Sequence, residues 1–362
     1  MRMRFRLSSQ RAKGEIVAGI AVGAPRVSGS RDRRVRERYA EWSALAAASG
    51  NVFATPEFVD SCLAKLVGAG VWIQTWPLAG AAAVFAVLVV ERIAGLRVAR
   101  LLGSPVADDL SPACAPESRS LAAEAIEDAC AELDADVLFA ERLPAEHGWP
   151  ELLGGQVLAT EASPVIPMGG PDWSSYLAGR SANFRQQVRR KARVLERAGA
   201  RYRLADSVSL DADLDTLFAL HRERWSTEST TFSEAEAFHR DFAATALQRG
   251  WLRLWLLEVE DEPIAATYGF RFGGSESYYQ SGRSQTWNKY SPGLVLLAHA
   301  VRAAMEEGVD EFRLLRGGEP HKSRFTDQGV MLVSLAVPRT ARGRAAVAAA
   351  NHVPRRLLRR LA

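Results

Sequence analysis

Cysteine and histidine are scarce in this 362-residue sequence, and their scarcity excludes two kinds of stabilising site. The three cysteines, Cys62, Cys114 and Cys130, are odd in number and widely spaced, which fits neither a disulfide framework nor a zinc site. Such usage is typical of a reducing compartment, so we expect a cytoplasmic protein. The six histidines form no pair at metal-ligand spacing, and the sequence therefore predicts no metal site.

Long apolar runs are also absent. The most apolar stretch, residues 78–90, has 13 residues, whereas a transmembrane helix needs ~20. The N-terminal arginines precede no apolar core of the signal-peptide kind, because Gly19 and Gly23 interrupt residues 16–24. We therefore expect neither a membrane span nor a secretory leader.

Charge is distributed unevenly along the chain, whose net charge is only +4. Residues 1–38 carry 11 Lys and Arg against 3 acids, and residues 339–362 carry 7 Arg and no acid. The two ends therefore sum to +15 and the remainder to −11. Nucleic-acid-binding domains usually carry their basic patch on the fold itself, so the acidic body argues against DNA as a partner.

Length and composition predict two domains between two basic ends. A chain of 362 residues, 48% hydrophobic, can bury two separate cores. Five prolines and five glycines in residues 143–172 indicate the boundary. We predict a flexible arm (1–37), an N-terminal domain (38–160), a C-terminal domain (161–338) and a basic tail (339–362).

Hydrophobic periodicity predicts an α/β (α+β) fold with a mixed, mostly antiparallel sheet flanked by helices. In the first half we expect strands at 71–76, 83–90, 95–102 and 136–140, and helices from residue 38, after Pro56 and at 121–133. In the second half we expect helices at 183–198, 214–225 and 235–248, then strands at 251–259, 264–272, 277–282, 311–315 and 330–337.

One further helix is predicted between the strands at 277–282 and 311–315. Ser291 is a suitable N-cap, Pro292 fits the first helical position and Gly308 fits the C-terminal cap. A helix entered from a polar loop directs unpaired backbone N–H groups toward that loop, which suits a phosphate. The alternative is an ordinary crossover helix without a ligand.

Four segments together resemble a known family. They are residues 51–58 (NVFATPEF), 183–199 (NFRQQVRRKARVLERAG), 289–294 (KYSPGL) and 312–317 (FRLLRG), the last followed by Glu319-Pro320 and Lys322. In order and spacing they resemble GNAT-type acyltransferases of the branch associated with cellulose and exopolysaccharide biosynthesis, which is related to the Fem-type peptidyltransferases. The resemblance covers roughly residues 38–338 and implies tandem GNAT-like domains, the first degenerate. Gly318 and His321 depart from it, because the group usually has an acidic residue and a tyrosine there.

The resemblance implies acetyl-CoA as co-substrate, with its pantetheine arm between two splayed strands. Tyr279, Gln280 and Ser281 would line that arm. The phosphates would lie in the following loop, against Arg283, Asn288, Lys289, Ser291 and Gly293. Because this loop is poor in glycine, charge-assisted bonds from side chains would have to replace backbone contacts. A solvated polar loop is the alternative.

Several basic and aromatic residues are candidates for binding the acceptor. Arg316, Lys322 and Arg324 follow a strand end, where arginine suits carboxylate or phosphate; a charge cluster balanced by Glu319 and Asp327 is the alternative. Residues 180–203 hold nine Lys and Arg, among them Arg189, against one acid. This face suits donor phosphates, a nucleotide sugar, a lipid-linked phosphate or tRNA, or is merely solvated. His221 and Trp225 share a helix face and could line an acceptor pocket.

Transfer from a thioester needs a base for the acceptor and an acid for the leaving thiolate. We expect Glu319 or His321 as base and Tyr279 as acid, with Glu258 as a further possible base and Tyr290 as a further possible acid. We expect acetyl transfer to an amine or hydroxyl of an envelope or exopolysaccharide precursor. Arg316→Ala or Lys322→Ala should abolish activity without unfolding the protein. Two alternatives stay open: aminoacyl transfer from tRNA, and a scaffold at the membrane surface that the arginine- and leucine-rich tail contacts.

Overall fold

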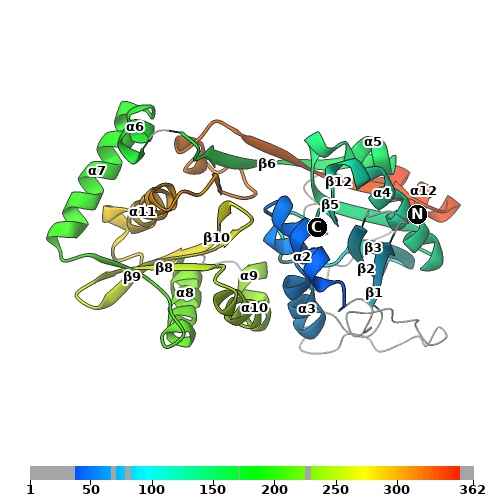
Figure 1. The fold of residues 1–362 in the computed structure, drawn as a ribbon, viewed down its shortest axis with the longest axis horizontal. Helices are drawn as coiled ribbons and strands as arrows, with labels where there is room; N and C mark the ends of the chain where they lie inside the picture. Colours follow the sequence, from blue (N-terminus) through cyan, green and yellow to red (C-terminus); the bar gives the residue numbers. More distant parts are fainter. Residues whose placement is uncertain (1–36, 67–70, 78–82, 171, 225–229, 351–362) are drawn as a thin grey trace, which may run out of the picture.

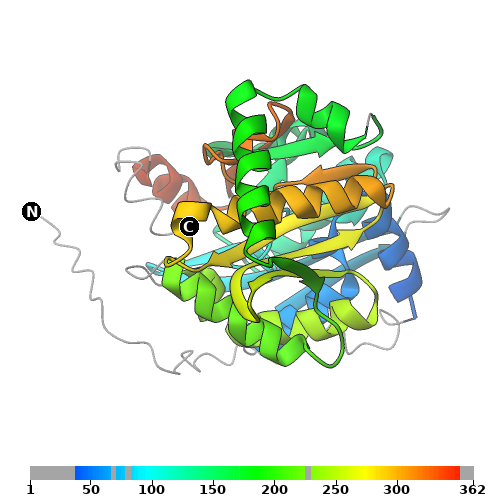
Figure 2. The same cartoon turned by 90° about the vertical axis from the view of Figure 1, so that its left-hand side faces the viewer.

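The structure is a computed structural model that describes residues 37–66, 71–77, 83–170, 172–224 and 230–350 (Figures 1 and 2). The strands are β1 Val71–Pro77, β2 Ala83–Ile93, β3 Leu96–Leu101, β4 Ala113–Cys114, β5 Val137–Pro144, β6 Gln156–Pro167, β7 Arg201–Leu204, β8 Leu252–Val259, β9 Glu262–Phe272, β10 Ser275–Arg283, β11 Glu311–Arg313 and β12 Gly329–Pro338. The helices are α2 Tyr39–Ala48, α3 Pro56–Lys65, α4 Arg119–Glu132, α5 Trp149–Leu153, α6 Trp173–Ala178, α7 Ala182–Arg197, α8 Leu210–Arg224, α9 Thr231–Glu234, α10 Glu236–Gln248, α11 Pro292–Glu306 and α12 Ala341–Ala350. Single 3-10 turns are η1 Val52–Ala54, η2 Pro116–Ser118, η3 Ala145–His147, η4 Asn288–Tyr290 and η5 Lys322–Arg324.

The strands form one continuous 12-stranded sheet in the order β1-β2-β3-β5-β12-β6-β11-β10-β9-β8-β7, with β4 paired to β2. Only the β3–β5 and β10–β11 pairs among the described strands are parallel. The predicted mixed, mostly antiparallel sheet flanked by helices is therefore confirmed (Figure 1).

The two halves of the chain repeat one arrangement. In the first half β1, β2 and β3 form an antiparallel meander, and the chain crosses through α4 to the parallel strand β5. In the second half β8, β9 and β10 form the meander, and α11 leads to β11. The tandem architecture is thus visible in the strand order, although no sequence repeat marks it.

The two units share strands at the centre of the sheet. β6 lies beside β11, and β12, the last of the described strands, lies between β6 and β5 of the first half. The predicted boundary at residues 160 and 161 falls inside β6. The division into domains at that point stays a prediction.

The core extends from one half into the other without interruption. Phe58 on α3 packs edge-on against Phe242 on α10, with ring centroids 5.1 Å apart. Phe53 on η1 likewise meets Phe270 on β9 at 6.4 Å. These contacts hold the first helices of the chain against the second meander, so the elements that carry the candidate site rest on both halves.

Helix α11 begins and ends near the predicted residues, but one cap differs. Pro292 occupies the first turn, and Gly308 has φ of 73° as expected for a C-terminal cap. The expectation of Ser291 as a side-chain N-cap is wrong. Ser291 has left-handed backbone angles (φ 54°, ψ 53°) because its N–H closes η4 on the carbonyl of Asn288, and its side chain makes no capping bond.

The two basic ends lie mostly beyond what the structure describes. The arm is described only at residue 37, and the tail contributes α12 before residues 351–362. The proposed membrane contact of the tail therefore falls outside the described residues. Among the helices that are described, none has both the length and the apolar character needed to cross a membrane.

Candidate active site

Strands β10 and β11 are neighbours only over their first residues. Their register pairs Ser275–Ser277 with Glu311–Arg313 and then stops. The chain after β11 stays beside β6, where the Leu314 N–H donates to the carbonyl of Pro164 at 2.8 Å. Within the described sheet, residues 278–283 of β10 thus pair with β9 alone. We call residues 278–283 the open edge, because backbone without a strand partner can bond to an extended ligand.

A β-bulge changes the direction of the side chains where the open edge begins. The register between β9 and β10 shifts between Tyr278 and Gln280, and such bulges often adjoin functional sites. Tyr278 packs with the apolar cluster under α11, and its hydroxyl lies 2.6 Å from the Ser281 hydroxyl. Tyr279 belongs to the larger core, and its hydroxyl donates to the carbonyl of Val106 at 2.6 Å. Tyr278 is therefore the tyrosine whose hydroxyl lies at the open edge.

Ser281 connects the open edge to α8. Arg224, the last residue of α8, donates to the Ser281 hydroxyl at 2.7 Å. One turn earlier, His221 Nδ1 lies 3.1 Å from the Ser281 carbonyl, and its Nε2 lies 2.9 Å from the Thr230 hydroxyl. Burial lowers the pKa of His221, so the ring is neutral and acts as a hydrogen-bonding support for the strand.

Gly282 allows α8 to approach the strand this closely. A Cβ atom at Gly282 would lie 2.4 Å from the backbone nitrogen of His221 and 2.5 Å from the carbonyl carbon of Leu220. Real Cβ atoms do not approach backbone atoms so closely, and only glycine fits here. The absent side chain is what places Arg224 against Ser281.

Arg283 lies where the open edge meets the start of α11. Its Nε donates to the Asn288 side chain at 3.2 Å, and its Cδ would be 3.6 Å from a Cβ on Gly293. The side chain therefore passes over the first turn of α11, where backbone N–H groups lack helical partners. Burial lowers the pKa of Arg283, and the nearby Arg224 lowers it further. An anion between these two guanidinium groups and the helix start would relieve their repulsion.

His321 is close enough to Arg224 and Arg283 for their charges to affect its pKa. Burial is the main cause that lowers its pKa; Glu319 opposes this effect, whereas Lys322, Arg224 and Arg283 add to it. The imidazole is accordingly neutral near pH 7 and able to accept a proton. Of the three predicted catalytic residues, the structure brings His321 and Glu319 to this region and directs Tyr279 to the other face. The catalytic roles themselves stay predictions.

Lys322 is buried and already paired. Only 5% of the residue is exposed, and its ammonium donates to the Arg316 carbonyl at 2.5 Å and lies 3.0 Å from a Glu319 oxygen. Burial acts to raise the pKa of Glu319, but the charge and hydrogen bond of Lys322, a backbone hydrogen bond and the nearby His321 together lower it. The prediction that Lys322→Ala leaves the fold intact is therefore revised, because that change would leave a carbonyl and a carboxylate unpaired.

The remaining predicted acceptor residues are dispersed. Arg316 pairs with Asp108 of the first half, its Nε 3.1 Å from the carboxylate. Arg324 lies over the Phe184 ring at 4.9 Å, and Arg189 is exposed on α7. Trp225 lies outside the described residues.

Two predicted donor-binding residues remain to be placed: Lys289, predicted to bind phosphate, and Gln280, predicted to line the pantetheine arm. The Lys289 ammonium is 4.8 Å from the Tyr290 ring centre, and its carbonyl accepts a hydrogen bond from Lys191 of α7. Gln280 is partly exposed and lies opposite Tyr268 in the sheet.

Arg224 and Tyr278 were not singled out by the sequence. Arg224 lies three residues after His221, a spacing that places both on one helix face, and this was the available signal. Tyr278 precedes the predicted Tyr279, and alternation in a regular strand assigned the wrong one to the open edge. No residue pattern in a single sequence locates the bulge.

Comparisons with known proteins agree with this geometry. A family model described as an acetyltransferase (GNAT) domain matches residues 182–323. The solved structure of FemX superposes with a TM-score of 0.60 at 9% identity, over 83% of this chain and 96% of that one. The C-terminal domain of a putative lysylphosphatidylglycerol synthetase from Agrobacterium fabrum gives 0.57 at 14% identity, over 87% and 96%. A protein of unknown function from Bacteroides thetaiotaomicron gives 0.56 at 12% identity, over 83% and 97%.

No protein of curated function matches the sequence significantly. At the identities of the solved structures, likeness shows a shared fold and not a shared reaction. The family match is independent of those structures, and it spans the helix α7, the second meander, the open edge and α11. Residues 182–323 therefore resemble a GNAT-type acetyltransferase domain.

Proposed function

We propose that the protein is an acyltransferase that uses acyl-CoA, in the first instance acetyl-CoA, and acts on an amine or hydroxyl of a cell-envelope or exopolysaccharide precursor in the cytoplasm. The observation that carries the proposal is the open edge of β10, which ends at Arg283 beside the start of α11. The acceptor class rests on the resemblance of the motifs, and the donor class rests on the site.

The groups at the open edge suit a long anionic donor. The guanidinium groups of Arg283 and Arg224 and the first N–H groups of α11 would bind phosphate. Pantetheine carries two amide groups, which can pair with backbone N–H and C=O groups of residues 278–283 as an added strand does. Such pairing would align the thioester with Tyr278 and Ser281.

In the proposed reaction the acceptor attacks the thioester carbonyl directly. The new bond to nitrogen or oxygen forms as the C–S bond breaks, the acceptor loses a proton and the thiolate gains one. His321, whose pKa is lowered mainly by burial, would take the first proton. The Tyr278 hydroxyl, hydrogen-bonded to Ser281 at 2.6 Å, replaces Tyr279 as the candidate donor of the second.

Calorimetric titration of the full chain with CoA and acetyl-CoA tests the donor. We expect binding of both, weakened about 10- to 100-fold in Arg283→Ala, because charge-assisted bonds to phosphate would be lost. Arg302→Ala is the control, since Arg302 is an exposed residue near the far end of α11 and is paired only with Glu306 among the described residues. Absence of binding at high protein concentration, or equal binding by Arg283→Ala, would refute this donor site.

A second candidate, aminoacyl transfer from tRNA, is favoured by the exposed face of α7. Four arginine side chains are exposed there, those of Arg189, Arg190, Arg193 and Arg197. Within the described part of the chain, none of these side chains has a hydrogen bond or an ion pair. Lys191 on the same helix bonds to the carbonyl of Lys289, so this face adjoins the candidate site. Tight tRNA binding that weakens steeply with salt, in a protein that binds no CoA, would support this candidate.

A further inference from the structure

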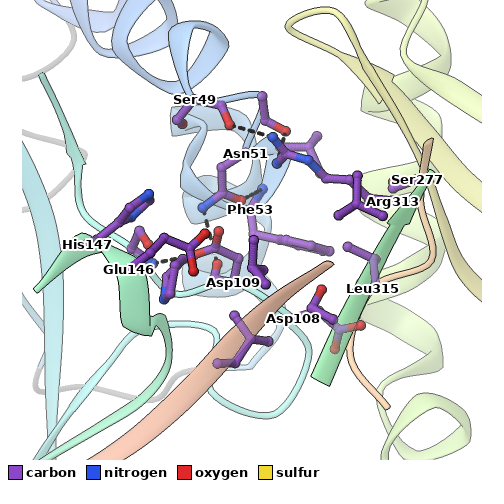
Figure 3. A pocket seen from close by; sticks show the side chains of 18 of the residues that line it. Ser49, Asn51, Phe53, Asp108, Asp109, Glu146, His147, Ser277, Arg313 and Leu315 are labelled. Atoms are coloured by element: carbon purple, nitrogen blue, oxygen red, sulfur yellow. Dashed lines mark hydrogen bonds between the residues drawn. The ribbon is translucent and has the colours of Figure 1, made fainter. Parts of the chain in front are cut away.

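A pocket lies on the face of the sheet opposite α11. This pocket of about 310 Å³ has walls from several segments of the chain (Figure 3). They are the end of α2 with the turn into η1, the loop before α4, the turn η3, and parts of β6, β11 and β12. Leu315 lines this pocket, whereas the adjacent Leu314 packs under α11. The pocket therefore lies on the face of the sheet opposite α11, the face on which α8 also packs, and Arg283 does not line it.

Some charged groups in the pocket wall are already neutralised by partners. Arg313 donates to the carbonyl oxygens of Ser49 at 2.9 Å and Gly50 at 3.0 Å, and to Glu311 at 2.6 Å. Asp108 is paired with Arg316, as described above. These groups hold the wall together and offer little to a ligand.

Three other charged groups in the wall have unused bonding capacity. Arg119 is half-buried and Glu146 is exposed. Among the described residues, neither side chain makes a hydrogen bond or an ion pair. Asp109 accepts the Ser111 N–H with Oδ1 at 2.8 Å, which leaves its second oxygen free. Figure 3 shows Asp109 and Glu146 on the same side of the pocket as His147.

His147 shows that these groups share one electrostatic environment. Burial and Arg119 lower the pKa of His147, whereas Asp109 and Glu146 act in the opposite direction. One unpaired cation and two carboxylates thus face the same imidazole. The rest of the wall is largely apolar, and the side chains that supply it are Val52, Phe53, Val165, Leu315, Val330 and Leu332.

We propose that this pocket binds a small zwitterion with an apolar side chain, namely a free α-amino acid or a short peptide end. Its carboxylate would pair with Arg119 and its ammonium with Asp109 and Glu146, while the side chain lies on the apolar wall. A phosphate ester would face two carboxylates, and an uncharged sugar would leave the opposite charges unsatisfied. The volume corresponds to about ten water molecules at liquid density, which suits a ligand the size of leucine.

Calorimetric titration of the full chain with L-leucine tests the proposal, together with two analogues that each lack one charge. Leucine should bind, while 4-methylpentanoate, without the ammonium, and 3-methylbutylamine, without the carboxylate, should bind at least about 10-fold more weakly. Arg119→Gln should weaken leucine binding about 10- to 100-fold, and Glu146→Gln should weaken it less because Asp109 remains.

Matched controls separate the pocket from the rest of the molecule. Arg92→Gln and Glu124→Gln change exposed residues of the first half that do not line the pocket, and they should bind leucine as the wild type does. Arg283→Ala should also leave leucine binding unchanged, so failure of the proposed acyl-CoA site would not affect this result. No heat from leucine at millimolar concentration, or unaltered binding in both Arg119→Gln and Glu146→Gln, would overturn the proposal.

Discussion

Replacing Gly282 by alanine should damage both stability and the candidate site. The added Cβ would lie 2.4 Å from the His221 nitrogen and 2.5 Å from the Leu220 carbonyl carbon, whereas unstrained contacts lie at about 3.5–4.0 Å. Helix α8 or strand β10 must therefore move by about 1 Å. Since both obstacles are backbone atoms, we expect a loss near the upper end of the ~1–3 kcal/mol typical of overpacking.

Gly293→Ala is the matched comparison, because this glycine-to-alanine change should raise the free energy of unfolding instead of lowering it. Its Cβ would meet only the Cδ of Arg283 at 3.6 Å, an ordinary contact. Alanine is favoured over glycine within a helix, so this variant should gain up to ~1 kcal/mol. Urea unfolding followed by circular dichroism measures both changes, and titration with acetyl-CoA reports on the site. A Gly282→Ala protein as stable as the wild type would refute the close packing of α8 on β10.

Three more predictions concern buried charge. Lys322→Met should lower the midpoint of thermal unfolding, because the Arg316 carbonyl and Glu319 lose their partner; an unchanged midpoint would contradict this. Arg316→Ala should lose activity and should also lower the midpoint of thermal unfolding, because the buried carboxylate of Asp108 loses the arginine that pairs with it. Retained activity would remove Arg316 from the site. His239 is buried with both ring nitrogens unpaired, and burial lowers its pKa to about 3. The neutral imidazole contributes fully to the free energy of unfolding at pH values above its pKa in the unfolded chain, which is about 6.5, and this contribution is lost as the pH falls toward 3. His239→Phe should therefore make the free energy of unfolding fall less steeply between pH 7 and about pH 4.

The sequence predicted those elements whose apolar residues recur with a clear period. The stripe of Phe184, Val188 and Leu195 is buried, as the predicted α7 requires. Strand β6 lies inside the segment 143–172, whose prolines and glycines predicted the domain boundary. Most of its residues are exposed or half-buried, and its two partners, β11 and β12, are distant in sequence. Local periodicity cannot report a strand whose stability comes from pairing on both sides.

The candidate site was predicted in outline and not in detail. The segment was found because a strand, a polar loop and a proline-started helix follow one another there. The direction of Tyr278 depends on a bulge, the approach of Arg224 depends on Gly282, and the pairing of Lys322 depends on a turn that brings Glu319 to it. Each is a result of tertiary packing, which a single sequence does not display.

The central position of β12 has a consequence for synthesis on the ribosome. β5, made early, has its antiparallel partner in residues 329–338, close to the end of the chain. Until that segment emerges, an emerging polypeptide would present the edges of β5 and β6 to its surroundings, and unpaired edges invite association with other chains. The first half would therefore keep one unpaired strand edge until residues 329–338 are made. A ribosome stalled before residue 329 would hold a sheet divided into two unjoined parts.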